Sequence, residues 1–307
     1  MLNPQGCTMT EKSLAPVVLF VYNRPEHTLK TIAALKANGL ALQTDLFVYA
    51  DGARGPAHQP SVDAVRECIA DIKGFKSVTV NVSQSNRGLT DSIVGGVTTV
   101  VQQYGQVIVV EDDIVVSPTF LDYMNDALTY YKNNDRVWHI AGWGYPTQFN
   151  TEKDVFFYRL MQCWGWATWS DKWAHLEMDS QALHERFDNK RRKRFNIDGY
   201  DRIWNQIKHN RNNKINTWDV FWYATIFERD GLCLCPTKSF VRNIGHGDGV
   251  HCKDTSFVDN DELNTKSYLT LEDHVLEDAD ILQQIKAYLW SQKKGVFAKV
   301  KTYLRTR

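Results

Sequence analysis

The sequence lacks a hydrophobic run long enough to cross a membrane. Its first apolar run, residues 17–22, is far shorter than the ~20 residues that a membrane-spanning helix needs. Residues 1–14 are polar and do not combine a basic stretch with a long apolar stretch, as a secretory signal does. We therefore expect a cytoplasmic protein.

The sequence also lacks net charge, because its 36 Lys and Arg residues match its 36 Asp and Glu residues. Nucleic-acid-binding proteins usually carry a basic excess or stripe, so we expect no nucleic-acid partner. The six cysteines are scattered and suggest no disulfide framework.

One group of cysteines leaves a zinc site open as an alternative. Cys233 and Cys235 are followed by His246, His251 and Cys252. Closed zinc sites usually place two residues between paired cysteines, whereas only one separates these two. The spacing therefore favours buried thiols on a short strand.

The first half of the chain contains short apolar runs that alternate with amphipathic stretches. These patterns predict strands at 16–22, 45–50, 77–82 and 106–110, and helices at 25–38, 61–72, 90–103 and 118–131. Strand and helix alternation at this spacing predicts an α/β fold with a doubly wound, mostly parallel sheet. This half, residues 15–117, would be Rossmann-like and bind a nucleotide.

The second half, residues 118–285, has a different composition. It contains several tryptophans between residues 164 and 173 and a basic segment, 186–194, that we expect to be one helix. We expect an α-rich, acceptor-side half, so that residues 1–285 form a single catalytic domain.

The remaining residues, 286–307, form a basic tail with seven Lys or Arg residues and no acid. Because aromatic and aliphatic residues are interleaved with the cations, the tail could lie on anionic lipid on the inner face of a membrane. The alternative is a terminal helix that packs on the domain.

Polar residues follow four of the predicted strands, namely Asn23-Arg24, Asp51-Gly52, Asn86-Arg87 and Glu111-Asp112-Asp113. Open parallel sheets bind ligands beyond the carboxyl ends of their strands, so we expect these residues to converge. The acidic run offers hard oxygen ligands for Mn²⁺ or Mg²⁺, which bind one or two carboxylates together with substrate phosphates. The alternative is a solvated acidic turn.

Three segments together resemble GT-A-fold glycosyltransferases. They are Val-Val-Leu-Phe-Val-Tyr-Asn-Arg-Pro at 17–25, Tyr-Ala-Asp-Gly at 49–52 and Val-Val-Glu-Asp-Asp at 109–113. More narrowly, the chain resembles the N-acetylglucosaminyltransferase I-like group and bacterial family 2-like glycosyltransferases, from about residue 16 to residue 252. The fold implied is GT-A, and the acidic run is the family's DXD-type metal motif.

The resemblance implies donor-binding roles for five of these residues. Asp113 would be the direct metal ligand, Asp112 would contact the ribose or sugar, and Arg24 would contact the diphosphate. Asp51 would accept a hydrogen bond from the base, and Arg87 lies in a loop that closes over the nucleotide. Arg24 in a surface salt bridge and Asp51 as a turn residue are the alternatives.

Further residues receive roles from the same resemblance. Glu111 and a late histidine, His251, would add metal contacts, and Trp166 would help to shape the sugar pocket. Asp219, flanked by tryptophans, would be the catalytic base that takes the proton of the acceptor hydroxyl. The alternatives are core packing for Trp166 and an N-cap role for Asp219, with Glu228 and Asp230 as weaker candidates for the base.

The sequence therefore predicts a metal-dependent, inverting glycosyltransferase of the hexosyl- or N-acetylhexosaminyltransferase type. The resemblance implies a UDP-sugar donor, UDP-N-acetylglucosamine first, and a glycan or lipid-linked glycan acceptor in bacterial surface polysaccharide assembly. One alternative is a sugar nucleotidyltransferase, although the glycine-rich basic loop of that class is replaced by Tyr-Asn-Arg-Pro-Glu at 22–26. Another is a catalytically silent carbohydrate-binding protein on the same fold.

Overall fold

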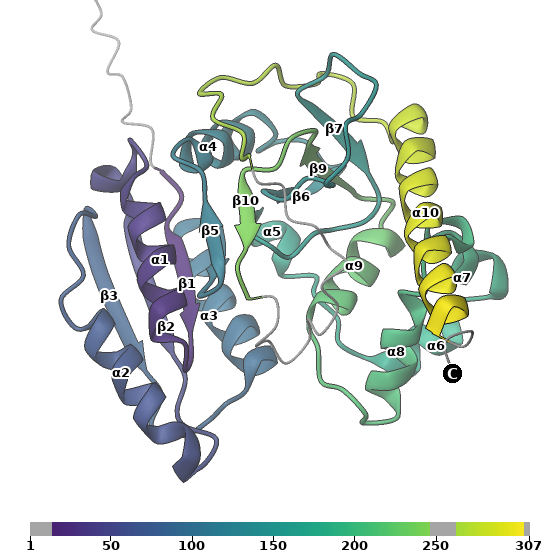
Figure 1. The fold of residues 1–307 in the computed structure, drawn as a ribbon. Helices are drawn as coiled ribbons and strands as arrows, with labels where there is room; N and C mark the ends of the chain where they lie inside the picture. Colours follow the sequence, from purple (N-terminus) through teal and green to yellow (C-terminus); the bar gives the residue numbers. More distant parts are fainter. Residues whose placement is uncertain (1–13, 246–261, 304–307) are drawn as a thin grey trace, which may run out of the picture.

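The computed structural model describes residues 14–245 and 262–303, with side chains up to residue 292. Its main sheet has eight strands in the order β3-β2-β1-β4-β8-β6-β9-β7, and β10 and β5 form a separate two-stranded ribbon. Helices pack around the main sheet (Figure 1). The predicted α/β class with a mostly parallel sheet is confirmed, and the arrangement is consistent with a GT-A-like fold.

The first half follows the predicted alternation closely. Its elements are β1 (Val17–Val21), α1 (Pro25–Lys36), β2 (Asp45–Ala50), α2 (Gln59–Ile69), β3 (Ser77–Val82), α3 (Leu89–Tyr104) and β4 (Gln106–Glu111), with 3₁₀ turns η1 (Ala41–Gln43) and η2 (Pro56–His58). All five residues of β1 are buried, as expected for a central strand with both faces covered. Helix α1 begins at Pro25, whose fixed φ suits a first helical turn, and α3 ends at Gly105 in the left-handed conformation.

The winding of the sheet reverses at β1, which lies between β2 and β4 and is parallel to both. The chain runs outward from β1 through β2 to β3 and then returns to β4 on the other side of β1. The register places Phe20 opposite Glu111, so the carboxyl ends of β1 and β4 are adjacent. Such a reversal is where open α/β sheets bind ligands.

Antiparallel pairing enters the sheet in the second half. Strand β5 (Ile114–Val116) ends the first half, and the strands of the second half are β6 (Val137–Ala141), β7 (Val155–Tyr158), β8 (Trp166–Trp169), β9 (Leu232–Pro236) and β10 (Val241–Asn243). Its helical segments are α4 (Phe120–Tyr130), α5 (Ser170–Trp173), α6 (Ser180–Arg186), α7 (Asn189–Phe195), η3 (Ile197–Gly199), α8 (Trp204–Arg211), α9 (Asp219–Glu228) and α10 (Ala279–Tyr303). Strand β8 runs antiparallel to both β4 and β6 and so joins the two halves in one sheet.

The expected single helix over 186–194 is wrong, because two helices, α6 and α7, share this segment. The chain is extended at Phe187 and Asp188, and the carboxylate of Asp188 accepts a hydrogen bond from the backbone N–H of Arg191 at 2.7 Å. The aspartate therefore caps a new helix, which the run of cations alone did not indicate.

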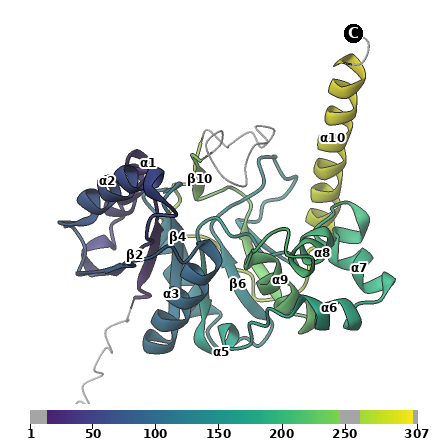
Figure 2. The same cartoon turned by 90° about the horizontal axis from the view of Figure 1, so that it is seen from below.

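Helix α10 lies on the side of the molecule opposite β3 and α2 (Figures 1 and 2). It begins at Ala279, so residue 286, where we expected the tail to start, falls inside the helix. Across the described residues, we find no helix with the length and apolar character needed to cross a membrane.

Candidate active site

The acidic turn between β4 and β5 is held by two distant parts of the chain. The backbone carbonyl of Asp112 accepts a hydrogen bond from the hydroxyl of Thr31 in α1 at 2.8 Å. The carbonyl of Asp113 accepts one from the backbone N–H of Ile244 at 2.8 Å, directly after β10. Because β5 also pairs with β10, the turn is fixed on both sides.

Arg24 faces this turn from the end of β1, as the parallel register requires. Its Nη1 lies 2.7 Å from Oδ2 of Asp113 and 3.9 Å from Oδ1 of Asp112. Burial disfavours the charged guanidinium, but the carboxylates of Asp112, Asp113 and Glu111 outweigh this effect and raise the pKa of Arg24. The surface salt bridge considered as an alternative does not describe this arginine, which is partly buried among three acids.

One guanidinium does not neutralise three acids. Burial, followed by the charges of Asp113, Asp112 and Asp219, raises the pKa of Glu111 well above its ordinary value. Burial and the charge of Asp113 raise the pKa of Asp112 to about 7, against the opposing effects of Arg24 and the Tyr22 N–H. The turn therefore concentrates negative charge that a cation would stabilise.

Gly245 passes directly over the pair formed by Arg24 and Asp113. A β-carbon at this position would lie 2.3 Å from Oδ2 of Asp113 and 2.9 Å from Nη1 of Arg24. The backbone N–H of Gly245 donates to Oδ1 of Asn243 at 2.7 Å, which fixes the close approach. Glycines stand at 245, 247 and 249 in the sequence, but this pattern does not indicate that the first of them closes the acidic turn.

Asp51, at the end of β2, organises the loop that leads into α3. Its Oδ1 accepts hydrogen bonds from the backbone N–H groups of Gly52 and Arg87, both at 2.8 Å. Its Oδ2 accepts from the Asn86 side-chain amide and the Gly88 N–H, both at 2.9 Å. All four acceptor positions of the carboxylate are therefore in use, and the observed role of Asp51 is to position the loop.

The side chains of Arg87 and Trp166 pack against residues outside the acidic turn. The guanidinium of Arg87 lies against Gly95 in α3, 3.2 Å from where a β-carbon of Gly95 would stand. Trp166 is 1% exposed and packs between the rings of His139 and Trp218, with centroid distances of 5.3 and 5.2 Å. This arrangement supports the core-packing alternative for Trp166.

Asp219 is the first residue of α9, and the preceding residue, Trp218, occupies the N-cap position. Asp219 is therefore not the N-cap that the alternative interpretation required. Its charge contributes to raising the pKa of Glu111 and, after burial, that of Cys163, so all three side chains lie near one another. The structure thus places Asp219 within electrostatic reach of the acidic turn, although more than 100 residues separate them.

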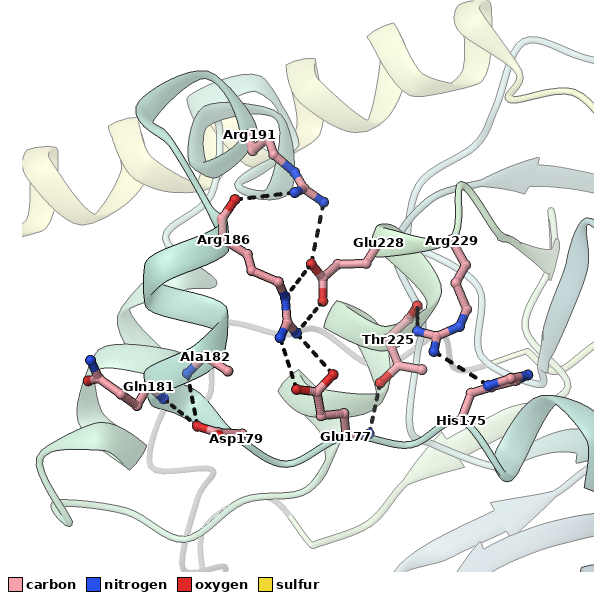
Figure 3. A network of polar contacts seen from close by, with 10 residues as sticks. All are labelled: His175, Glu177, Asp179, Gln181, Ala182, Arg186, Arg191, Thr225, Glu228 and Arg229. Carbon is pink, nitrogen blue, oxygen red and sulfur yellow. Dashed lines mark hydrogen bonds and ion pairs between the residues drawn. The ribbon is translucent and has the colours of Figure 1, made fainter.

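Glu228, at the other end of α9, belongs to a separate polar network (Figure 3). Arg186 donates to both carboxylate oxygens of Glu228, at 3.0 and 2.7 Å, and to both of Glu177, each at 3.0 Å. Arg191 adds a contact to Glu228 at 3.5 Å. Both carboxylate oxygens of Glu228 are already engaged by arginines, so this geometry disfavours Glu228 as the base. Asp230 likewise pairs with Arg194, at 3.6 Å.

A small polar cluster beside the end of β1 was not anticipated as a unit. The hydroxyl of Tyr22 and the amide of Asn23 each lie 3.2 Å from Nδ1 of His58, and the Tyr22 and His58 rings are stacked. The Tyr22 hydroxyl also accepts the backbone N–H of Arg54 at 3.1 Å. No signal in the sequence pointed to His58, because it lies in the irregular connection between β2 and α2.

The donor set of the acidic turn fits a hard divalent cation. Asp113 presents a carboxylate beside Arg24, and Mn²⁺ or Mg²⁺ commonly takes one or two protein carboxylates while phosphates and water complete its coordination. Within 14–245 and 262–292, no three His, Cys, Asp or Glu side chains are arranged as a complete metal site. His251 lies outside the described residues, so its predicted metal contact stays a prediction.

The structure does not support zinc binding by Cys233 and Cys235, the two residues of the zinc alternative that are described. Cys233 and Cys235 are free, buried residues of β9, and burial raises the pKa of both thiols well above the ordinary value. Neutral thiols in a strand interior are weak metal ligands, because zinc binds the thiolate.

The fold and the acidic turn at the reversal of the sheet are consistent with a GT-A-type glycosyltransferase. A model of the GNT-I family matches residues 96–195, which include β4, the acidic turn and β8. The predicted resemblance is thereby confirmed for this segment, and the match implies glycosyltransferase activity. Arg24, Asp51 and Asp219 lie outside the matched segment. A comparison with curated proteins gives no match to the sequence.

Proposed function

We propose that this protein transfers a sugar, with inversion, from a UDP-sugar to a hydroxyl of a glycan or lipid-linked glycan acceptor, in a metal-dependent reaction. The observation that carries the proposal is the meeting of Arg24 with Asp112 and Asp113 at the carboxyl ends of neighbouring parallel strands. The GNT-I match across the acidic turn supports the sugar-transfer chemistry and UDP-N-acetylglucosamine as the first donor to test.

The polar groups near the turn suit a nucleoside diphosphate. Asp113 would hold Mn²⁺, with Glu111 as a further candidate ligand, and Asp112 would contact the ribose or sugar. Arg24 supplies a guanidinium for the diphosphate, a group that binds phosphate oxygens in bidentate fashion. When bound, the metal would stabilise the negative charge that develops on the leaving diphosphate.

Asp51 and Arg87 would act on the base side of the donor. Asp51 holds the backbone of Arg87 and Gly88 with charge-assisted hydrogen bonds, so it would set the shape of the loop near the base. A direct contact of Asp51 with the base would require one of these bonds to be exchanged. The side chain of Arg87 would have to leave Gly95 to reach the nucleotide.

Asp219 would act as the general base on the acceptor side. It lies at the start of α9, where its charge reaches Glu111, and so it stands near the acidic turn without being part of it. From this position it would take the proton of the acceptor hydroxyl as the new glycosidic bond forms at the anomeric carbon. Inversion follows when the hydroxyl attacks the anomeric carbon from the face opposite the leaving diphosphate.

The proposal also covers where in the cell the protein acts. We propose a cytoplasmic protein in bacterial surface polysaccharide assembly, with the basic stretch 286–307 as a peripheral contact to anionic lipid. Six of its seven cations and the interleaved aromatic residues support that role, whereas Lys286 is buried and pairs with Asp198. Flotation of the full chain and of a truncation at residue 285 with anionic vesicles tests it, because equal flotation would exclude a contact through the tail.

The central test is calorimetric binding of UDP, GDP and dTDP, each with and without Mn²⁺, to the wild-type protein and Asp113→Ala. We expect UDP to bind in the presence of Mn²⁺ and to lose at least about tenfold in affinity without the metal or without Asp113. Nucleotide binding that is equally tight without Mn²⁺ and in Asp113→Ala would contradict the proposed site. Metal-dependent UDP binding without turnover of any UDP-sugar would instead support the catalytically silent alternative, and pyrophosphate release from UTP and a sugar phosphate would support a nucleotidyltransferase.

A further inference from the structure

A cavity of about 460 Å³ lies between η3 and α10, away from the acidic turn. Two exposed aromatic rings and a charged pair line it, together with a glutamine amide: Tyr200, Trp290, Asp198, Lys286 and Gln283. It lies on the side of the molecule that carries α7 and α10, opposite β3 and α2 (Figures 1 and 2).

The backbone that forms one wall of this cavity is strained. Ile197, Asp198 and Gly199 have φ values of 50°, 55° and 94°, so three consecutive residues occupy the left-handed region. This conformation is rare for residues other than glycine and is especially unfavourable for a β-branched isoleucine. Strain of this kind persists only where surrounding contacts impose it, and it often marks functional sites.

Two cations hold the strained turn in place through Asp198. The carboxylate of Asp198 lies 2.6 Å from Nζ of Lys286 and 3.1 Å from Nη1 of Arg159. Lys286 and Arg159 are 8% and 6% exposed, whereas the Asp198 side chain is 35% exposed, so both pairs are partly shielded from water. The ion pairs fix α10 against the turn and place polar groups at the floor of the cavity.

The rings of Tyr200 and Trp290 lie next to each other, beside the charged pair. Their rings make an edge-to-face contact at 6.5 Å, and Nζ of Lys286 lies 5.9 Å from the Tyr200 ring centroid. Trp290 is 53% exposed and Tyr200 is 36% exposed, although burial of such rings is usually favourable. Exposed aromatic faces beside carboxylate, ammonium and amide groups suit a sugar, whose C–H face packs on a ring while its hydroxyls form hydrogen bonds.

We propose that this cavity is an accessory binding site for a carbohydrate chain. Identifying the bound carbohydrate as the acceptor glycan depends on the proposed glycosyltransferase function, whereas carbohydrate binding by the cavity does not. The site would hold sugar units of the acceptor that do not react and would raise the local concentration of the acceptor at the enzyme.

A lipid surface is a less suitable occupant of this cavity. Aromatic residues that insert into a membrane project from an apolar helix face, with cations on the opposite face. Here the two rings instead border a concavity that contains a partly buried ion pair and an amide. A second cavity of about 670 Å³, lined by Lys190, Lys193 and Arg194 among others, also includes Asp198 and extends the polar surface beyond the first.

The test is the binding of chitotetraose and tetragalacturonate to the full chain, measured by calorimetry and by saturation-transfer NMR. We expect saturable binding of at least one of the two, a rise of about tenfold or more in its Kd in Trp290→Ala, and retention of most of the affinity in Trp290→Phe. Tyr268→Ala is the matched control, because Tyr268 is an aromatic residue that is 84% exposed and does not line the cavity.

The outcomes separate this proposal from the proposed function. UDP binding with Mn²⁺ should be the same in Trp290→Ala and in the wild-type protein. Carbohydrate binding that depends on Trp290 in a protein that does not bind UDP would support the cavity and contradict the glycosyltransferase function. The proposal is overturned if neither oligosaccharide binds saturably or if Trp290→Ala and Tyr268→Ala weaken binding equally. Loss of flotation with anionic vesicles in Trp290→Ala, without carbohydrate binding, would identify this surface as a membrane contact.

Discussion

The half of the molecule that contains β1 to β4 and the half that contains α5 to α9 hold their polar side chains in different ways. In the first, Arg24, Asp51 and the acidic turn follow buried strands, so the topology of the sheet brings them together. In the second, polar groups lie within aromatic packing, as His139 does, or in surface networks such as that of Arg186. Strand order therefore places the candidate donor-binding residues, whereas side-chain packing places those of the acceptor side.

Asp219 connects the two arrangements, because it starts a helix of the second half and its charge reaches the acidic turn of the first. If it is the base, Asp219→Asn should lower kcat about a thousandfold, since an amide cannot accept the proton of the acceptor hydroxyl. The Kd of UDP with Mn²⁺ should stay within about threefold of the wild-type value, because the base acts on the acceptor. Steady-state kinetics and calorimetry measure the two effects, and a parallel loss of both would instead place Asp219 in donor binding.

The other end of the same helix supplies the matched control. Glu228→Gln makes the same chemical change in the network of Figure 3, where two arginines engage the carboxylate. We expect kcat to be unchanged and the free energy of unfolding to fall by about 1 kcal/mol, because the network is partly exposed. A large loss of kcat in Glu228→Gln would remove the distinction between the two ends of α9.

Gly245 tests how tightly the acidic turn is closed. In Gly245→Ala the new methyl group would meet Asp113 and Arg24, and the displacement should weaken UDP binding with Mn²⁺ about 10- to 100-fold, as expected for overpacking of ~1–3 kcal/mol. Gly39→Ala, where an added β-carbon meets nothing within 4 Å, is the control and should bind UDP normally. Equal affinities for the two variants would show that the turn adapts easily.

The protonation of His139 is expected to have the smallest effect on stability at neutral pH. It tests how the second half holds its buried polar groups. The Nδ1 of His139 accepts the indole N–H of Trp222 at 3.2 Å, and its Nε2 donates to the carbonyl of Gln162 at 3.0 Å. Burial disfavours the charged imidazolium and lowers the pKa of His139 to about 3, against the opposing effect of the hydrogen bond to the Gln162 carbonyl. The folded state then binds fewer protons than the unfolded state between about pH 3 and 6.5, so stability is retained above this window and lost as the pH falls.

The expected slope of this loss is up to about 1.4 kcal/mol per pH unit. Urea unfolding at several pH values between 4 and 7 measures it, and His139→Gln should reduce the slope even if the variant is less stable at pH 7. An unchanged slope in His139→Gln would show that other groups govern the acid sensitivity.

Much of the donor side could be predicted from the sequence, because it depends on short-range patterns and on the rules of parallel sheets. The bounds of β2 and β3 agree residue for residue with the prediction, and Arg24 meets Asp113 because strand ends at a reversal of the sheet must be close. Asp51 was placed correctly at the end of β2, but its four hydrogen bonds depend on a loop conformation that carries no periodic signal.

The features that could not be predicted from the sequence depend mainly on contacts between residues far apart in the chain. A tryptophan pattern does not distinguish a ring in the core from one in a pocket, so the burial of Trp166 between His139 and Trp218 could not be predicted. The single helix expected over 186–194 failed because one aspartate, Asp188, caps a new helix inside a basic run. The approach of Gly245 to Asp113 joins residues more than 130 positions apart, and no local pattern encodes it.

The pairing of β5 with β10 has a consequence for the order in which the chain acquires its site during synthesis. Arg24, Asp51 and the three acids all emerge from the ribosome within the first 113 residues, yet the strand that braces the acidic turn comes from residues 241–243. A nascent chain that has completed β4 therefore has the anionic turn without Ile244 to bond it or Gly245 to close it. The turn reaches the geometry described above only after most of the polypeptide has been translated, which couples assembly of the site to completion of the second half.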